Sequence, residues 1–532
     1  MPVRTAAVLG LAALAFGTAA SADGHAPQVS GLVVSNGGAR YLGDRSLLAT
    51  ISPNGDGYRE SALIRFRLDE PATVKLTVAS LGYRGRKVFD RTLRLGRGRH
   101  TVRWAPRAWI QPRTYVVRLR VRDRNGNVGT YGFSRGSRKA VIRVLGIDAA
   151  FEHESYAPNS SAELELESDQ PTLALQLFRA GSERIVTKAN DTMNGEPMTE
   201  PVRIERADRR NRPRLLRVWI GDWPSGVYFA KLTGSDGRSG YAPFVVRPRK
   251  LGEHRVAVVM PTYTWQAYNF RDENGDGYGD TWYAGRTHRT LLGRAYLDRG
   301  VPPFFRTYDL NFLVWLARGE RAGKDRAVDF LADSDLATAP SSYELARSYD
   351  LLVFPGHHEY VTRREYLLVT GYRNRGGNLM FLSANNFFWR VDRKGPTLTR
   401  VAKWRDLGRP EAALLGVQYL ANDHGGRKGP FVVRHSPHNE WVLAGTGLQQ
   451  GSRFGHFGIE IDHITRRSPR GISVIAEIPN LLGRGRTAQM TYYETAKTAK
   501  VFAAGAFTLG GYARYLPVSQ LLDNLWERMA KP

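Results

Sequence analysis

Cysteine is absent from the 532-residue sequence. This absence excludes disulfide bonds, cysteine-bound zinc, iron–sulfur clusters and a thiol nucleophile. If the chain is exported, cross-links do not stabilise its folded state. Any catalytic or metal-binding group must therefore come from side chains other than cysteine.

Long hydrophobic runs are also lacking. No window outside the N-terminus holds the ~18 uncharged apolar residues that a membrane-spanning helix needs. The apolar stretch at residues 6–20 is short and alanine-rich, follows Arg4, and ends at the small-residue cleavage pattern Ala20-Ser21-Ala22. We therefore predict a signal peptide over residues 1–22. The mature protein is expected to be soluble and secreted, either extracellular or in the cell envelope.

Acidic residues are few relative to basic ones: 50 Asp and Glu stand against 77 Lys and Arg, so the formal net charge is +27. The excess is arginine-rich and spread along the chain without a compact basic patch. No basic motif interleaved with aromatic residues is present, so we expect no nucleic-acid partner. The charge favours anionic cell-envelope polymers as partners, and it also serves solubility.

Two successive stretches have the period-two pattern of β-sandwiches. In residues 28–146, Ile64, Phe66 and Leu68 alternate with arginines, and residues 147–250 contain similar alternating runs. Clusters of turn-forming residues separate the runs, and no long helical period interrupts them. We predict two β-sandwich modules, at 28–146 and 147–250.

The first stretch carries the sequence SPNGDG at residues 52–57, which resembles a turn of Ig-like modules in exported bacterial proteins. Asn54, Asp56 and Glu60 have oxygen atoms suited to calcium. Asn-Gly and Asp-Gly are equally ordinary turn formers, so both interpretations stay open. The resemblance implies an Ig-like fold for this module.

The pattern changes in residues 251–532, where short apolar segments alternate with helical ones. Segments with the length of buried strands occur at residues 255–260, 349–354 and 378–382. Between the last two, Thr362 and Glu365 have the spacing of a capping box, which predicts a helix that stops at Gly376-Gly377. Strand, helix and strand of these lengths predict a parallel sheet in an α/β domain.

A dense group of titratable side chains follows the second of these strands. His357, His358 and Glu359 lie in one short loop before the predicted helix, where open parallel sheets bind ligands. The zinc-protease motif HExxH is excluded, because Thr362 stands where the second histidine is needed. Consecutive histidines point in different directions, so we expect at most one of them to join Glu359. The alternative is that these side chains only cap the helix start.

A second candidate site is an acidic loop at residues 272–280. Asp272, Asn274, Asp276 and Asp280 match positions 1, 3, 5 and 9 of a calcium loop, with glycine at position 6. Position 12 is Tyr283, so the bidentate glutamate is missing. We predict a calcium site in this loop, with an acidic surface loop as the alternative.

The stretch from about 253 to 530 resembles the C-terminal domain of the N,N-dimethylformamidase large (beta) subunit family. The second predicted sandwich, with SGVY at 225–228, is similar to the module that precedes it there. The matching motifs occur in the family's order: TWQAYN at 264–269, GHHEY at 356–360, GGNL at 376–379, NNFFWR at 385–390, GIEID at 458–462 and YET at 493–495.

This resemblance implies a class I glutamine-amidotransferase-like fold and a mononuclear Fe(III) held by two tyrosinates and a glutamate. Glu359 matches the glutamate ligand, and Tyr268 matches one tyrosine. Tyr228 is a weaker match for the other, with Tyr241, Tyr278 and Tyr283 as competitors. Phenolate and carboxylate are hard oxygen donors that suit ferric iron without sulfur.

The resemblance also assigns roles around the metal: His357 matches a catalytic histidine and Asn385 an active-site asparagine. His358 and Phe388 depart from the family pattern. We therefore predict a secreted hydrolase that cleaves the C–N bond of a small-molecule or envelope amide. The alternative hypothesis is a non-catalytic envelope protein that binds polysaccharide with the same fold.

Overall fold

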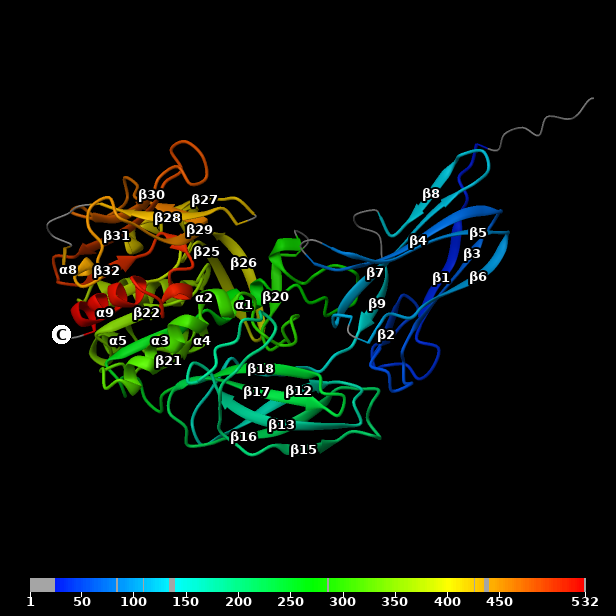
Figure 1. The fold of residues 1–532 in the computed structure, drawn as a ribbon, viewed down its shortest axis with the longest axis horizontal. Helices are drawn as coiled ribbons and strands as arrows, with labels where there is room; N and C mark the ends of the chain where they lie inside the picture. The colour runs from blue at the N-terminus through cyan, green and yellow to red at the C-terminus, as the bar shows by residue number, and fades with distance from the viewer. Residues whose placement is uncertain are drawn as a thin grey trace, which may run out of the picture.

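The computed structural model describes residues 24–82, 85–108, 110–133, 139–284, 287–424, 426–434 and 440–530. The predicted signal peptide lies outside the described residues. None of the helices in the described ranges is long and apolar enough to cross a membrane. The chain is rich in β-structure and multidomain in arrangement, with its N-terminal strands at one end and its C-terminal elements at the other (Figure 1).

The first predicted module contains two β-sheets with a shared core. One sheet has the order β1-β3-β6 and the other β2-β9-β7-β4-β5, with β8 paired to β7. Ile64, Phe66 and Leu68 are buried along β3, which confirms the predicted alternation. The strands are β1 (Val29–Ser35), β2 (Leu48–Ile51), β3 (Ala62–Leu68), β4 (Ala72–Ser80), β5 (Lys87–Leu95), β6 (Gly98–Trp104), β7 (Arg113–Arg122), β8 (Val128–Tyr131) and β9 (Ala140–Val144).

The second predicted module also has two sheets. Their orders are β10-β12-β16 and β11-β18-β17-β13-β14, with β15 paired to β13. Leu164 and Leu166 of β12 face Leu173 and Leu177 of β13 in one hydrophobic cluster. The strands are β10 (Asp148–Phe151), β11 (Ser155–Tyr156), β12 (Ser160–Glu167), β13 (Thr172–Arg179), β14 (Glu196–Pro197), β15 (Val202–Glu205), β16 (Arg214–Ile220), β17 (Gly226–Gly234) and β18 (Ser239–Val246).

The C-terminal region is built on an eleven-stranded sheet that is only partly parallel. The expected parallel pairing is confirmed for β21-β19-β22-β24-β32. Beyond β32 the sheet continues antiparallel through β31, β30, β28, β29 and β27, which the sequence analysis did not predict. These strands are β19 (Val256–Met260), β21 (Asp329–Ala332), β22 (Leu351–Phe354), β24 (Asn378–Phe381), β27 (Gln418–Asn422), β28 (Lys428–Val433), β29 (Arg453–His463), β30 (Ser473–Ile478), β31 (Ala488–Glu494), β32 (Lys500–Ala503) and β33 (Ala506–Phe507).

A separate four-stranded sheet lies beside the main one, in the order β20-β26-β25-β23. Its strands are β20 (Arg289–Leu291), β23 (Tyr360–Thr362), β25 (Trp389–Lys394) and β26 (Thr397–Lys403). Because β23 begins at Tyr360 and follows β22 by only five residues, the segment 355–359 joins the two sheets.

Short helices surround these sheets. The predicted capping box is confirmed, because Thr362 accepts a hydrogen bond from the Glu365 backbone while Glu365 accepts one from Thr362. The helix ends at Arg373, three residues before Gly376. The helices are α1 (Thr262–Ala267), η1 (Trp282–Ala284), α2 (Phe305–Tyr308), α3 (Leu310–Arg321), α4 (Asp333–Thr338), α5 (Ser342–Ser348), α6 (Arg363–Arg373), η2 (Trp404–Leu407), α7 (Ala412–Leu415), α8 (Glu440–Leu443), η4 (Gly510–Tyr512) and α9 (Val518–Met529).

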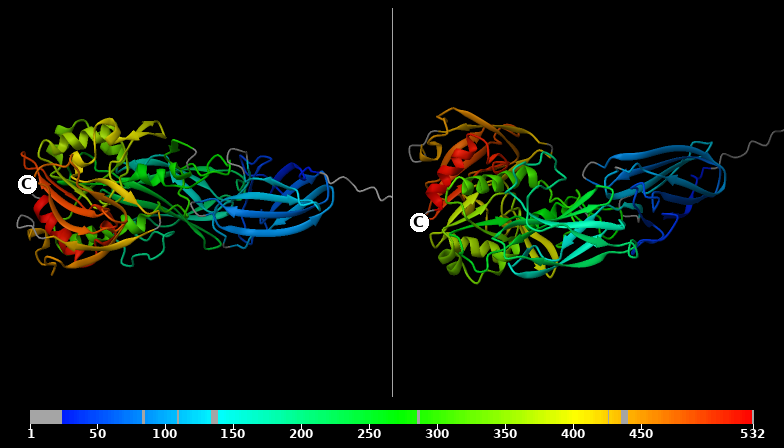
Figure 2. Two further views of the ribbon diagram at one scale, coloured as in Figure 1. Left: turned by 90° about the horizontal axis from the view of Figure 1, so that it is seen from above. Right: turned by 60° about the horizontal axis from the view of Figure 1, so that its bottom comes forward.

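The second module packs tightly on the C-terminal region (Figure 2). Phe229 of β17 lies in the same hydrophobic cluster as Phe312 and Leu313 of α3. Ser225 Oγ accepts a hydrogen bond of 2.7 Å from the Phe330 backbone in β21. A continuous core therefore holds the sheet edge beside the second module in a fixed position.

Candidate functional site

Three phenols and an imidazole gather around the Glu359 carboxylate, just beyond the carboxyl end of β22. The Tyr268 hydroxyl lies 2.9 Å from Glu359 Oε2, and the Tyr283 hydroxyl lies 3.3 Å from the same oxygen. His357 Nε2 lies 3.2 Å from it. Tyr360 completes the group: its ring lies 6.4 Å from that of Tyr268 between centroids, and the charge of Glu359 helps to raise the pKa of its hydroxyl. We call these five residues the phenol–carboxylate cluster.

Distant elements supply the three phenols. Tyr268 is the C-cap of α1, a helix that begins directly after β19. Tyr283 belongs to η1, and Tyr360 is the first residue of β23. Tyr268 and Tyr360 are mostly enclosed, whereas Tyr283 exposes 39% of its surface. The Tyr283 ring therefore forms the outer wall of the cluster, with its hydroxyl directed inward.

His357 is held in one tautomer by its surroundings. Its Nδ1 lies 3.1 Å from the Ala384 carbonyl, which only accepts, so Nδ1 carries a proton. Nε2 lies between the Tyr268 hydroxyl at 2.9 Å, which can donate to it, and Glu359 Oε2 at 3.2 Å, which can only accept from it. The ring packs edge-on against Phe507, at 4.5 Å between centroids. His357 is thus oriented to exchange a proton through Nε2.

His358 points away from the cluster, as the sequence analysis expects for consecutive histidines. Its ring packs at right angles on Phe354, at 5.0 Å between centroids. Neither ring nitrogen has a hydrogen-bond partner among the described residues. Burial lowers the pKa of His358 to about 3, so its ring is neutral at physiological pH.

Asn385 connects the cluster to two further carboxylates. Its Nδ2 donates to Glu460 Oε2 at 2.7 Å, and its backbone donates to both Asp462 oxygens. Its own Oδ1 is buried and has no partner in the described part of the chain. Burial raises the pKa of Glu460 well above its usual range, and the nearby Glu359 carboxylate raises it further. Glu460 therefore holds its proton more tightly than an ordinary glutamic acid does.

Glu460 and Asp462 lie in a motif identified from the sequence, but neither was predicted to be a site residue. They stand on the same face of β29, two residues apart, and 75 and 77 positions from the Asn385 they contact. The signal was present in the motif at 458–462, where two carboxylates alternate with buried isoleucine on a strand. No spacing rule connects that strand to Asn385.

Left-handed backbone conformations are concentrated around this site. Asn385 has φ of 53°, Ile459 of 73°, Phe304 of 62° and Thr508 of 82°. For bulky or β-branched side chains such values are unfavourable and persist only where the surroundings impose them. Phe304 packs against the Tyr268 ring at 6.0 Å between centroids. Such strain is typical of functional sites.

The sequence model described as "N,N-dimethylformamidase beta subunit-like, C-terminal" matches residues 213–512, more than half of the chain. The chain belongs to this family. The match begins in the second predicted module, at residue 213 just before β16, and it spans every residue of the phenol–carboxylate cluster.

Other comparisons add little. No curated protein matches the chain. Among solved structures, the native conformation of E. coli alpha-2-macroglobulin aligns with a TM-score of 0.24 and 10% identity, over 42% of this chain and 16% of that one. The chain thus spans about a sixth of that protein's length. A similarity this weak carries no argument about fold or function.

The side chains around Glu359 bear on the iron site that the sequence resemblance implies. No group of three or more His, Cys, Asp or Glu side chains in the described ranges is arranged to hold a metal ion. The donors of the cluster are mostly phenols, which lie outside those residue types. Burial, and then the charge of Glu359, raises the pKa of Tyr268, Tyr283 and Tyr360 well above its usual range. A bound cation would offset these effects and stabilise the deprotonated tyrosine side chains. The phenol and carboxylate oxygens therefore fit a hard metal ion.

Tyr228, the weaker sequence match for a metal ligand, lies elsewhere. Its hydroxyl donates to the Pro224 carbonyl at 2.8 Å, and its ring stacks on Trp223 in the second module. Tyr241 belongs to the hydrophobic core, and Tyr278 lies beneath Lys139. Of the four tyrosines considered for the second ligand, only Tyr283 contacts Glu359.

The predicted calcium loop is closed by its own backbone. Asp272 accepts hydrogen bonds from the Asp276 and Gly277 backbones, and Asp280 accepts one from Glu273. Asn274 Oδ1 accepts from the Asp276 backbone at 2.9 Å. Burial raises the pKa of Asp272 to about 7.

This loop also contacts the first module. Arg45 Nη2 donates to the Asn274 and Gly275 carbonyls at 2.7 and 3.0 Å, and Arg143 Nη2 donates to the Glu273 carbonyl at 3.0 Å. The Lys139 ammonium lies 3.8 Å from the centre of the Tyr278 ring. The acidic loop is therefore fixed against the N-terminal strands by three cationic side chains.

The SPNGDG segment forms a turn stabilised by its own side chains. Glu60 Oε1 accepts hydrogen bonds from the Gly55 and Gly57 backbones. Asn54 Oδ1 and Asp56 Oδ1 accept from backbone groups two residues further on. These contacts are those of an ordinary turn.

Proposed function

We propose that the protein is a secreted, metal-dependent hydrolase that cleaves the C–N bond of an amide. The observation that carries this proposal is the convergence of three phenols and an imidazole on the Glu359 carboxylate. Membership of the N,N-dimethylformamidase beta subunit-like family suggests a hydrolase-type function. The substrate is a small-molecule or envelope amide.

Ferric iron is the metal that this donor set favours. Tyr268, Tyr283 and Glu359 would hold it, with the Tyr360 ring packed beside that of Tyr268. Phenolate and carboxylate oxygens are hard donors, which prefer hard, highly charged ions. When bound, the metal supplies Lewis-acid chemistry that polarises an amide carbonyl and acidifies water.

His357 and Glu460 move protons in this proposal. His357 accepts a proton at Nε2, because Nδ1 is committed to the Ala384 carbonyl. Glu460, whose buried carboxyl holds its proton more tightly than usual, would donate a proton to the departing amine. An acid with a raised pKa next to an ionised carboxylate is a common division of roles in hydrolytic sites.

Asn385 orients the groups around the reacting carbonyl. Its amide nitrogen holds Glu460 at 2.7 Å, and Asp462 fixes its backbone. Its strained backbone and unpartnered Oδ1 leave it ready to bind a polar substrate atom such as an amide N–H. Asn385 therefore positions substrate and Glu460 together.

The finer fold assignments belong to the same proposal. The parallel strands β19, β22 and β24, with the cluster directly after β22, support a class I glutamine-amidotransferase-like arrangement. The paired sheets of residues 29–144 and 148–246 support two Ig-like sandwiches. Residues 1–22 support export to the cell envelope or beyond.

Metal analysis of protein expressed with ample iron tests the proposal. We expect one ferric ion per chain and a visible tyrosinate-to-iron absorption band. Glu359→Gln should lose both, whereas Tyr228→Phe, which removes a phenol outside the cluster, should keep both. Wild-type protein without a transition metal after such expression would overturn the iron assignment. Iron-loaded protein that releases no amine from a panel of simple amides would overturn the hydrolase assignment.

A further inference from the structure

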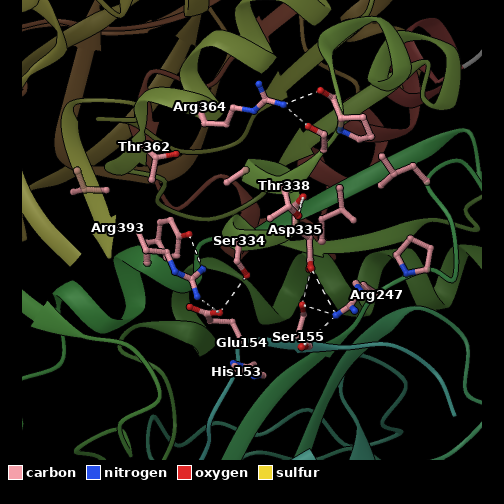
Figure 3. A pocket seen from close by; sticks show the side chains of 18 of the residues that line it. His153, Glu154, Ser155, Arg247, Ser334, Asp335, Thr338, Thr362, Arg364 and Arg393 are labelled. Carbon is pink, nitrogen blue, oxygen red and sulfur yellow. Dashed lines mark hydrogen bonds and ion pairs between the residues drawn. The ribbon is translucent and has the colours of Figure 1, made fainter. Parts of the chain in front are cut away.

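A cavity of about 920 Å³ lies between the second module and the C-terminal region, apart from the phenol–carboxylate cluster. Four chain segments form its walls: the loop after β10, the segment after β18, helix α4, and the start of α6 with the adjacent end of β25. Figure 3 shows their side chains projecting into the space. None of the five residues of the phenol–carboxylate cluster lines this cavity.

Cationic side chains outnumber anionic ones around this cavity. Six arginines and lysines line it, against three carboxylates. Lys250 and Arg363 are exposed and have no hydrogen bond or ion pair with any described residue. Arg364 uses Nη2 for the Ala339 and Pro340 carbonyls, which leaves its other donors available. The lining charges are Arg247, Arg249, Lys250, Arg363, Arg364 and Arg393 against Glu154, Asp335 and Asp392.

One of the lining residues carries a buried acceptor. The Glu154 side chain is 8% exposed, and its Oε1 has no hydrogen-bond partner among the described residues. Its Oε2 accepts from Ser334 Oγ at 3.2 Å and lies 3.7 Å from Arg393. A buried carboxylate oxygen without a partner is costly unless a ligand or water donates to it.

Hydroxyl groups complete the lining. Ser155, Ser334, Thr338 and Thr362 all line the cavity, and Ser155 Oγ donates to Asp335 at 2.7 Å. Figure 3 shows Arg393 and Arg247 on either side of Glu154 and Ser155, with Arg364 across the opening. The site therefore combines separated positive charges with short polar groups, which suits a ligand that has both anionic groups and hydroxyls.

We propose that this cavity binds an acidic oligosaccharide, a sugar chain with carboxylate groups. Lys250, Arg363 and Arg364 would pair with its carboxylates, and the hydroxyls of Thr338 and Thr362 would accept from sugar hydroxyls. This binding site is separate from the proposed hydrolase activity. It would give part of the chain's excess positive charge a specific binding role.

Nucleic acid and phospholipid fit the cavity less well. Binding of a nucleic-acid strand relies on exposed aromatic faces on which the bases stack. Among the described residues that line this cavity, the only aromatic or imidazole rings are Tyr263 and His153, and the Tyr263 side chain is fully buried. Bilayer binding favours an exposed apolar face beside the basic residues, whereas this lining is dominated by charged and hydroxyl side chains.

Calorimetric titration of the full-length protein with hexagalacturonate tests the proposal, with neutral maltohexaose as the comparison ligand. We expect binding of the acidic ligand alone, weakening as salt increases. The double variant Lys250→Ala/Arg363→Ala should bind it about tenfold more weakly, the loss expected for charge-assisted contacts. Both side chains are exposed, so the variant should keep the wild-type circular dichroism spectrum.

A matched control separates this site from the general charge of the protein. Arg67→Ala/Arg99→Ala removes two exposed charges from β3 and β6 and should leave the affinity within about twofold. Equal weakening by both double variants would overturn the proposal, as would no binding of hexagalacturonate or equal binding of maltohexaose. Tighter binding of a single-stranded oligonucleotide or of anionic vesicles than of hexagalacturonate would also overturn it. All these readouts are independent of iron and amide hydrolysis.

Discussion

Glu359 is the residue on which the site depends, because one of its carboxylate oxygens meets Tyr268, Tyr283 and His357. Tyr268 and Glu359 were both identified from sequence, because each lies in a short motif of the family. Tyr283 could not be separated from its competitors, because the loop at 272–280 intervenes between it and Tyr268. Only the folded chain brings its hydroxyl to Glu359.

The phenols should differ in their effect on iron. Tyr268→Phe and Tyr283→Phe each remove a proposed ligand, so we expect loss of the visible band and of bound iron. Tyr360→Phe removes a neighbouring phenol that is not a proposed ligand, so iron should remain with an affinity lower by about 10- to 100-fold. Competition with a chelator, followed by absorbance, measures this order. Full iron content in Tyr283→Phe would show that another side chain is the second ligand.

Glu460 should matter for turnover and not for iron. Glu460→Gln keeps the hydrogen-bonding shape beside Asn385 but removes the proton, so kcat for an amide should fall by roughly 100-fold or more. Because Glu460 acts as an acid with a raised pKa, the wild type should lose activity as the pH rises and this proton is released. The residual activity of the variant should not show this decline at high pH. A variant with normal kcat would assign Glu460 a structural role only.

At the scale of elements, helix α6 shows what local sequence can and cannot determine. The capping box at Thr362 and Glu365 was predictable because its spacing is local. That Glu365 also meets Asp333 of α4 was not, since they are 32 positions apart in sequence. The antiparallel half of the main sheet could not be predicted for the same reason. Its strands pair across long sequence separations, and no helices between them signal those pairings in the sequence.

The Asp333–Glu365 pair should make stability depend on pH. Burial raises the pKa of both carboxyls, and the Asp333 charge raises the pKa of Glu365 further, whereas the hydrogen bond to Glu365 offsets part of the rise at Asp333. Below the ordinary carboxyl range, near pH 4, both folded and unfolded chains hold these protons. As pH rises toward the raised pKa, the unfolded chain releases them first, so stability falls by about 1.4 kcal/mol per pH unit for each retained proton.

Glu365→Gln should reduce that dependence. The amide keeps an oxygen for Thr362 and removes the Glu365 carboxyl, whose proton the folded chain holds more tightly than the unfolded chain does. Denaturant unfolding between pH 5 and 8 should therefore show a shallower decline of stability in the variant than in the wild type. Parallel declines in the two proteins would show that this pair does not set the slope.

At the scale of the whole molecule, the acidic loop at 272–280 links the first module to the cluster. It contacts Arg45 and Arg143 of the first module, and Tyr283 follows it by three residues. The sequence analysis predicted this loop as a cation site, and calcium there stays a prediction. Its contact with the first module had no local signature, because the arginines lie well over a hundred positions away.

Removing those arginines should loosen the loop. Arg45→Ala/Arg143→Ala deletes hydrogen bonds from guanidinium groups to three carbonyls, worth about 1–3 kcal/mol of local stability. Hydrogen–deuterium exchange of residues 272–284 should therefore accelerate about tenfold. The Arg67→Ala/Arg99→Ala control should leave these rates unchanged. Unchanged exchange in the first variant would show that the contacts do not hold the loop.

Calcium should act on the same segment. If Asp272, Asn274, Asp276 and Asp280 bind the ion, adding millimolar Ca²⁺ should raise Tm and slow exchange in the loop. Asp272→Asn should remove that response, and Mg²⁺ should not replace Ca²⁺. An identical response in Asp272→Asn would place the ion elsewhere.

The continuous core between the second module and α3 has a consequence for anyone who shortens this chain. Phe229 shares its packing with Phe312 and Leu313, so a fragment that starts at residue 251 would leave apolar side chains of α3 open to water and should aggregate. A fragment that starts at residue 147 keeps that packing and should be purified as a monodisperse species. The smallest workable fragment is thus set by a shared interior and not by the extent of the phenol–carboxylate cluster.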